Sequence, residues 1–172
     1  ALYSFPSNDN AGESISIGFD FPFYDEEYNS LIINPNGWIG FGSDADSWEN
    51  TTIPSSTAPG PAIFGLWDDL NPINDNCNSY CSGNVYYYSN NEKFVVWFDE
   101  VAHWWNNFED SYYDFQFILY PNGQIDLNYN TLTGTHSATI GIQDANGVNG
   151  MQVASDQSYL HDGLSLKFSQ GP

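Results

Sequence analysis

Apolar and polar residues alternate strictly over the segment Ser14 to Phe23, which reads SISIGFDFPF. A period of two is typical of a β-strand with one buried face, because successive side chains of an extended chain point to opposite sides. The segment therefore predicts a half-buried strand whose core face carries Ile15, Ile17, Phe19, Phe21 and Phe23.

Turn-forming residues separate further apolar runs along the chain. Pro35-Asn36-Gly37 and Pro121-Asn122-Gly123 each lie between two such runs, and Asn and Gly supply the positive φ that a tight hairpin needs. A third hairpin is expected around Asn90-Asn91 and a fourth, with a longer loop, at Asp144 to Gly150. Gly163 to Phe168 alternates again and predicts a final strand.

Roughly ten strands at short spacing predict an all-β fold, an antiparallel two-sheet sandwich that is jelly-roll-like and has almost no helix. The composition agrees, since aromatics make up 17% of the chain and Lys, Arg and Met are nearly absent. Glu49 to Pro61 is rich in Ser, Thr and Pro and is expected to be an exposed connection. The length favours one sandwich over residues 14–172, preceded by a short strand and flexible leash at 1–13.

The charge is strongly one-sided: 22 acidic residues face two lysines and no arginine, for a formal net charge of −20. Nucleic acid is a poor partner, because phosphate binding depends on Lys and Arg. An anionic membrane surface is excluded by the same repulsion. The charge leaves three interpretations open, namely a merely solubilising surface, attraction for divalent cations, or a neutral partner such as a glycan.

The sequence has no run of 18 apolar residues, so no transmembrane segment is expected. A chain that begins at Ala1 suits an exported protein without its signal peptide, and a cloned fragment would look the same. In an exported protein, Cys77 and Cys81 predict a local disulfide; a zinc half-site is disfavoured because no second Cys or His pair follows.

Signatures of catalysis are missing from the sequence. It contains no G-x-S-x-G element, and His103, His136 and His161 lack the spacing that places two histidines on one metal. It also lacks the alternating acidic run expected of a sandwich glycosidase. We therefore expect no catalytic residues and no enzyme activity.

The stretch FGLWDDLNP, Phe64 to Pro72, ends an apolar run with adjacent carboxylates. One interpretation is architectural: Trp67 lies in the core, and one Asp ties down the loop over Asn71 to Asn76 while the other meets solvent. The alternative is a calcium site, since carboxylate and amide oxygens suit hard cations. No cofactor is required, and calcium is the candidate, with ligands among Asp68, Asp69, Asn71 and Asp75.

Exposed aromatic rings can stack on the faces of sugars, so loop tryptophans are candidates for glycan binding. Most aromatics lie in strand patterns that predict burial. Trp48, Trp104 and Trp105 are the exceptions, because they fall in apparent loops. Asn50-Thr51-Thr52 is an N-glycosylation sequence, which makes Asn50 a candidate for modification.

Several motifs in order, GFDFPFYDEEYNSLIINPNGWIGFG, IFGLWDDLNP, GNVYYY, EKFVVWFDEV, YDFQFILYPNGQIDLNY and ATIGIQDANG, resemble the nidogen-like (NIDO) extracellular domain and a related module of secreted bacterial proteins. The likeness covers about Ile17 to Gly147. Asp25 departs from it, standing where the family usually has Gly, and the loop from Cys77 to Cys81 looks like an insertion. The resemblance implies an extracellular, non-enzymatic module used in matrix, adhesion or assembly, with no catalytic residues to transfer.

We therefore expect a structural or adhesive module of an extracellular surface fibre or matrix, whose partners are copies of itself or a matrix glycan. The alternatives are a carbohydrate-binding module and a calcium-stabilised accessory domain of a secreted hydrolase. The N-terminal segment Ala1 to Pro6 offers two possibilities. It folds back onto its own sheet edge, or it is donated to a neighbouring subunit, with Leu2, Tyr3 or Phe5 filling a groove, and builds a head-to-tail filament.

Overall fold

The computed structural model describes residues 1–73, 82–104, 111–134 and 136–171, and the predicted disulfide of Cys77 and Cys81 lies outside them. Within these ranges the chain forms twelve strands and no helix. The strands are β1 (Leu2–Tyr3), β2 (Ile15–Phe23), β3 (Glu26–Asn34), β4 (Trp38–Gly40), β5 (Ala62–Trp67), β6 (Asn84–Ser89), β7 (Phe94–Ala102), β8 (Tyr112–Leu119), β9 (Ile125–Leu132), β10 (Thr139–Gln143), β11 (Gly150–Ala154) and β12 (Ser165–Phe168).

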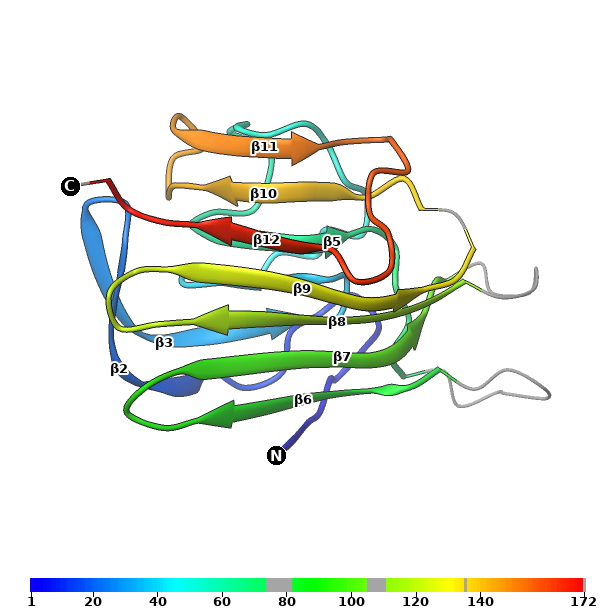
Figure 1. Ribbon diagram of the computed structural model, residues 1–172, viewed down its shortest axis with the longest axis horizontal. Helices are drawn as coiled ribbons and strands as arrows, with labels where there is room; N and C mark the ends of the chain where they lie inside the picture. Colours follow the sequence, from blue (N-terminus) through cyan, green and yellow to red (C-terminus); the bar gives the residue numbers. More distant parts are fainter. Residues whose placement is uncertain (74–81, 105–110, 135, 172) are drawn as a thin grey trace.

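The strands make two antiparallel sheets that pack face to face (Figure 1). Sheet I has the order β1-β6-β7-β8-β9-β12, and sheet II has the order β11-β10-β5-β4-β3-β2. Neither sheet closes on itself, so the predicted all-β two-sheet sandwich is confirmed.

The predicted hairpins are present, and their turns set the strand register. The turn at Pro35–Gly37 joins β3 to β4, and Gly37 has the positive φ (83°) expected there. The turns at Asn90-Asn91 and at Pro121–Gly123 join β6 to β7 and β8 to β9. The longer loop at Asp144 joins β10 to β11. Local turn chemistry was therefore a sufficient guide to these pairings.

The main core lies between the sheets and is dominated by aromatic rings. Phe98 and Phe115 stack with their centroids 4.8 Å apart, and Phe115 stacks on Tyr129 at 6.0 Å. The Tyr129 hydroxyl donates a hydrogen bond to the Gly65 carbonyl oxygen across the sandwich. The predicted core face of β2 is correct, since Ile17, Phe21 and Phe23 are buried there.

A second, smaller hydrophobic cluster covers the outer face of sheet II. The segment 44–61 lies across that face and buries Ile53, which is only 5% exposed, against strand residues that include Phe64 and Trp67. All six residues of β5 are consequently buried. The prediction that Glu49 to Pro61 is an exposed connection is correct only in part. Residues such as Glu49 and Thr52 are exposed, but Ile53 is buried because its side chain covers the apolar face of the sheet.

The N-terminal strand β1 pairs with β6 of its own chain, which is the fold-back arrangement. Leu2 lies opposite Tyr86, and Tyr3 lies opposite Val85. The Tyr3 ring is 6% exposed, and its hydroxyl accepts a hydrogen bond from the Ile33 amide and donates one to the Glu13 carbonyl. Tyr3 therefore fixes the edge of sheet I to β3 in sheet II, whereas Leu2 points to solvent with 58% of its surface exposed.

Candidate functional site: the tryptophan pocket

The two adjacent carboxylates after Trp67 point in different directions, as an extended chain requires. Asp68 is 5% exposed, and its Oδ1 atom accepts the Asp69 amide (2.9 Å) and lies 3.3 Å from His103 Nε2. Its Oδ2 atom accepts the Ser137 amide at 3.1 Å. Asp68 thus joins the end of β5 to the end of β7 and to the segment that leads into β10.

Burial acts to raise the pKa of Asp68, but the hydrogen bond and positive charge offered by His103 and the bonds from two amides outweigh it, so this pKa is lowered. The architectural interpretation is therefore supported for Asp68, and Trp67 is fully buried, as predicted. The anchored segment differs from the expected one. Asp68 holds Ser137, whereas the Asn71 amide at the start of the expected loop donates to the Ala102 carbonyl instead.

Asp69 faces the opposite way, into a surface pocket of about 370 Å³ lined by Asn8, Asp9, Trp48, Asp69 and Trp104. We call this the tryptophan pocket. Its two rings are among the most exposed large side chains of the described chain, with 49% of Trp48 and 44% of Trp104 accessible. The structure thus brings two of the three tryptophans predicted to stack on glycans to one place, beside one of the predicted cation ligands. Trp105 and Asp75 lie outside the described residues.

Both tryptophans are attached to the rigid end of β5. The Trp104 amide donates a 2.8 Å hydrogen bond to the Asp69 carbonyl, while Leu70 and His103 form an isolated β-bridge beside it. On the other wall, the buried Trp67 indole donates to the Ser47 carbonyl at 3.0 Å and so fixes the residue before Trp48. The pocket is therefore built on anchored backbone.

The side of the pocket that carries Asp9 and Asp69 is positioned by Asn34 and Asn36, two completely buried asparagines of the β3–β4 turn. The Asn34 amide group donates to the Asp9 carbonyl (3.0 Å) and to the Asp44 carboxylate (3.0 Å). Asn36 Oδ1 accepts the Leu70 amide (3.0 Å), and its Nδ2 lies 3.5 Å from Asp9 Oδ1. One turn therefore ties Asp9 to the segment that carries Asp69.

Burial raises the pKa of Asp69 to about 6, an effect to which the negative charges of Asp9 and Asp68 contribute and which His103 partly offsets. Near neutral pH the pocket carries acceptor oxygens beside two apolar rings. Such a combination suits a ligand that has both C–H faces and hydroxyl donors.

Calcium binding remains a prediction. Of the predicted ligands that the structure describes, Asp69 alone lines the pocket. Both oxygens of Asp68 already accept hydrogen bonds from the protein, and Asn71 Oδ1 is buried without a hydrogen-bond partner among the described residues. In the part of the chain that the structure describes, no group of three or more His, Cys, Asp or Glu residues is arranged to hold a metal ion.

The predicted glycosylation residue Asn50 lies away from this pocket. Its Nδ2 atom, to which a glycan would be attached, donates to the Ser137 carbonyl at 2.7 Å and to Thr139 Oγ1 at 3.1 Å. A glycan would have to replace these contacts, and glycosylation stays a prediction.

Sequence reasoning missed Asn8 and Asp9, which lie in the segment interpreted as a flexible leash. The contacts of Asp9 with the two buried asparagines bring this segment to the pocket, and Asn8 lines the pocket beside it. The PNG motif marked the turn at Asn36, but it carried no signal that both asparagine side chains point inward.

The fold and this site define a β-sandwich with an aromatic and acidic surface pocket. The family model for NIDO-related domains matches residues 1–165, and the chain belongs to this family. The predicted resemblance is confirmed. No match was found among curated proteins or among solved structures. The described residues include no helix that is long and apolar enough to cross a membrane.

Proposed function

We propose that this chain is an extracellular, non-enzymatic adhesive module that holds an uncharged carbohydrate in the tryptophan pocket. The observation that carries the proposal is that Trp48 and Trp104, both nearly half exposed, line one anchored pocket. An exposed aromatic ring does not gain the free energy that its burial would provide. Two such rings around one pocket therefore favour a ligand that covers them. NIDO-related domains are typically extracellular, which supports the location.

The charge of the pocket favours a neutral ligand. Asp9 and Asp69 line it, and the whole chain carries −20, so an anionic glycan would be repelled. Carboxylate oxygens accept hydrogen bonds from sugar hydroxyls, while the indole faces pack against the C–H faces of the ring.

Affinity electrophoresis through gels that contain mannan, xylan, amylose or a mixed-linkage β-glucan tests the proposal. The wild type should be retarded by at least one of these polysaccharides. Trp48→Ala and Trp104→Ala should each weaken binding at least tenfold, equal to about 1.4 kcal/mol. Tyr159→Ala is the matched control, because it removes a ring that is also 44% exposed but lies outside the pocket.

Two results would overturn the proposal. One is unchanged retardation of both tryptophan variants while their near-ultraviolet circular dichroism shows an intact fold. The other is release of reducing sugar ends that Asp69→Asn abolishes, because the pocket would then be catalytic.

We also propose, as a second function, polymerisation by exchange of β1 between subunits. The favouring observation is that β1 is only two residues long, lies at the edge of sheet I and precedes residues 4–14, which form no strand. Tyr3 fills a buried place and makes two hydrogen bonds there. The same contacts are available to the Tyr3 of a neighbouring chain, and repeated head-to-tail exchange would build a filament.

A disulfide trap between facing residues distinguishes exchange from fold-back. Ala1 and Tyr87 exchange both of their backbone hydrogen bonds, so Leu2 and Tyr86 form the non-hydrogen-bonded pair, for which Cα atoms are about 4.5 Å apart. Exchange predicts that oxidised Leu2→Cys/Tyr86→Cys runs as a covalent ladder on a non-reducing gel, whereas the wild type does not. If the oxidised variant is a cross-linked monomer at every protein concentration, this second function is contradicted.

A further inference from the structure

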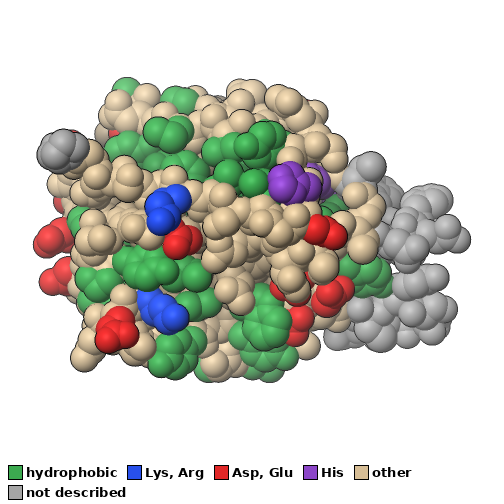
Figure 2. Space-filling view, in the orientation of Figure 1, with side chains coloured by type: hydrophobic (Ala, Val, Ile, Leu, Met, Phe, Trp, Pro, Cys, Tyr) green, Lys and Arg blue, Asp and Glu red, His purple; other side chains and the backbone are tan. Residues whose placement is uncertain are grey.

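The two sheets differ in what covers their outer faces. The outer face of sheet II is covered by the chain's own segment 44–61. The outer face of sheet I carries no such cover within the described residues, and Figure 2 looks directly onto it. Its hydrophobic side chains form separate patches with polar atoms between them, and both lysines of the chain lie there (Figure 2).

One row of side chains crosses this bare face from strand to strand. Tyr86 of β6 lies opposite Trp97 of β7, and Trp97 lies opposite Gln116 of β8. Gln116 lies opposite Asn128 of β9, and Asn128 lies opposite Ser165 of β12. We call these five residues the cross-strand row. Because neighbouring strands are about 4.8 Å apart, the row is about 19 Å long.

The first two members form an aromatic shelf. The centroids of Tyr86 and Trp97 are 5.6 Å apart, and their planes are inclined by 37°. The Trp97 indole donates a 2.7 Å hydrogen bond to Asp114 Oδ1, and Asn130 donates to Oδ2 of the same carboxylate at 2.9 Å. These bonds hold the Trp97 ring in one orientation, so a ligand would meet a shelf that is already ordered.

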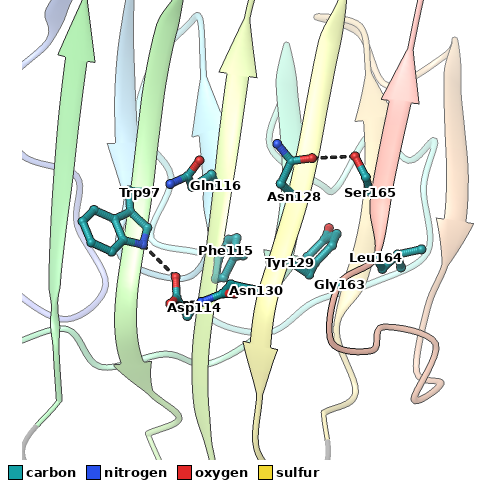
Figure 3. A pocket seen from close by; sticks show the side chains of 10 residues that line it. All are labelled: Trp97, Asp114, Phe115, Gln116, Asn128, Tyr129, Asn130, Gly163, Leu164 and Ser165. Carbon is teal, nitrogen blue, oxygen red and sulfur yellow. Dashed lines mark hydrogen bonds between the residues drawn. The ribbon is translucent and has the colours of Figure 1, made fainter.

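The other members line a hollow of about 400 Å³ beside Trp97 (Figure 3). The Gln116 carboxamide makes no hydrogen bond to the described protein. Asn128 uses only its Oδ1, which accepts the Ser165 hydroxyl at 2.5 Å, and its NH₂ group has no partner among the described residues. These groups therefore offer unused donors and acceptors next to an aromatic ring, on strands whose register sets their spacing.

We propose that the cross-strand row binds an uncharged polysaccharide chain that lies across the strands of sheet I. In this arrangement sugar rings stack on Tyr86 and Trp97, and hydroxyl groups bond to Gln116, Asn128 and Ser165. The site is distinct from the tryptophan pocket, whose residues it does not share.

The residues of the hollow disfavour other ligands. Among the described residues that line it, Asp114 carries the one carboxylate and no Lys, Arg or His is present, so phosphate and sulfate groups would face a negative charge. An apolar protein surface would have to desolvate two carboxamides without supplying partners for them. Hydroxyl groups satisfy both amides, and a chain of sugars matches the length of the row.

The test uses Trp48→Ala/Trp104→Ala as the background, so that the tryptophan pocket is already disabled. This protein should still bind the polysaccharide that retards the wild type, and isothermal titration with oligosaccharides of that polysaccharide should show affinity rising with length until the row is covered. Adding Gln116→Ala and Asn128→Ala should weaken the remaining binding at least tenfold. Adding Gln157→Ala and Asn146→Ala, two exposed carboxamides elsewhere, should leave it unchanged.

Two outcomes would overturn the inference. In one, the background variant loses all binding that the wild type shows, and the tryptophan pocket alone is the site. In the other, the row substitutions leave the affinity and its length dependence unchanged. Binding that the row substitutions abolish but the Trp48 and Trp104 substitutions leave intact would support the row and refute the pocket.

Discussion

The indole nitrogen of Trp97 lies 2.7 Å from the carboxylate of Asp114, on the neighbouring strand of the bare sheet face. Asp114 is 8% exposed, so this charge is largely withdrawn from water and held by neutral donors. Hydrogen bonds to charged groups contribute more to stability than those between neutral groups. The hydrogen bond therefore stabilises the fold and also fixes the orientation of the Trp97 ring at the surface.

Replacing Asp114 by alanine removes the acceptor of both Trp97 and Asn130. We expect the free energy of unfolding to fall by about 1.5 to 3 kcal/mol, the usual contribution of a hydrogen bond to a charged group. Urea unfolding measures this. Asp20→Ala should change it by about 0.5 kcal/mol or less, because the Asp20 side chain is exposed and accepts no hydrogen bond from the described residues. Equal losses in the free energy of unfolding of the two variants would contradict a stabilising contribution from the hydrogen bonds to Asp114.

Asp68→Ala should be among the most destabilising substitutions of a single acidic residue. It leaves the amides of Asp69 and Ser137, and the ring of His103, without their buried acceptor. The expected loss in the free energy of unfolding is about 3 kcal/mol.

The stabilisation by Asp68 should also depend on pH. Its pKa in the folded chain is below the ordinary value of 3.8. Its contribution is therefore fully present above about pH 4 and is lost as the pH falls through the lower, folded value. Acid unfolding curves should show a smaller difference between Asp68→Ala and the wild type at pH 2 than at pH 6. A difference that is constant with pH would contradict the lowered pKa.

Asp69 should have the opposite effect on the pH dependence. Its pKa rises from 3.8 to about 6 on folding, so between these values the folded chain binds more protons than the unfolded chain. Its contribution to stability therefore falls as the pH rises from about 4 to about 6. Asp69→Asn should have little effect on Tm at pH 4 and a stabilising effect at pH 7. Asp46→Asn, an exposed carboxylate with the same change of charge, serves as the control. Parallel Tm curves for wild type and Asp69→Asn would rule out the shift.

Ile53→Ala tests whether the segment over sheet II belongs to the hydrophobic core. The side chain is 5% exposed, and truncating a buried Ile leaves a cavity, so we expect a loss of about 2 to 4 kcal/mol in the free energy of unfolding. Val148→Ala is the control, because Val148 is 71% exposed and should contribute within about 0.5 kcal/mol. A loss for Ile53→Ala as small as that of the control would mean that the segment lifts off readily.

The strands and hairpins could be predicted because their signals are local. The alternation in β2 and the Asn and Gly residues of the turns depend only on neighbouring positions, and the structure follows them. The cover over sheet II could not be predicted in this way. Ile53 is one apolar residue among Ser, Thr and Pro, and its burial follows from the apolar outer face of β5, which it covers.

The tryptophan pocket could not be predicted from local sequence patterns either. Trp48 and Trp104 were recognised singly, but the pocket joins them to Asp9 and Asp69 from two further segments. Its assembly depends on the buried side chains of Asn34 and Asn36, and no spacing in the sequence relates these residues. The cross-strand row likewise depends on register between strands, which a single sequence leaves open.

The position of both lysines on the outer face of sheet I has a practical consequence for anything coupled to the protein. Lys93 and Lys167 carry the only side-chain amines of the chain. A reagent that acylates lysines would therefore attach a label, a bead or a sensor surface to the face that holds the cross-strand row. Material immobilised through these amines would present the opposite side of the sandwich to solution, whereas a tether in the loop between β10 and β11 would leave the row open.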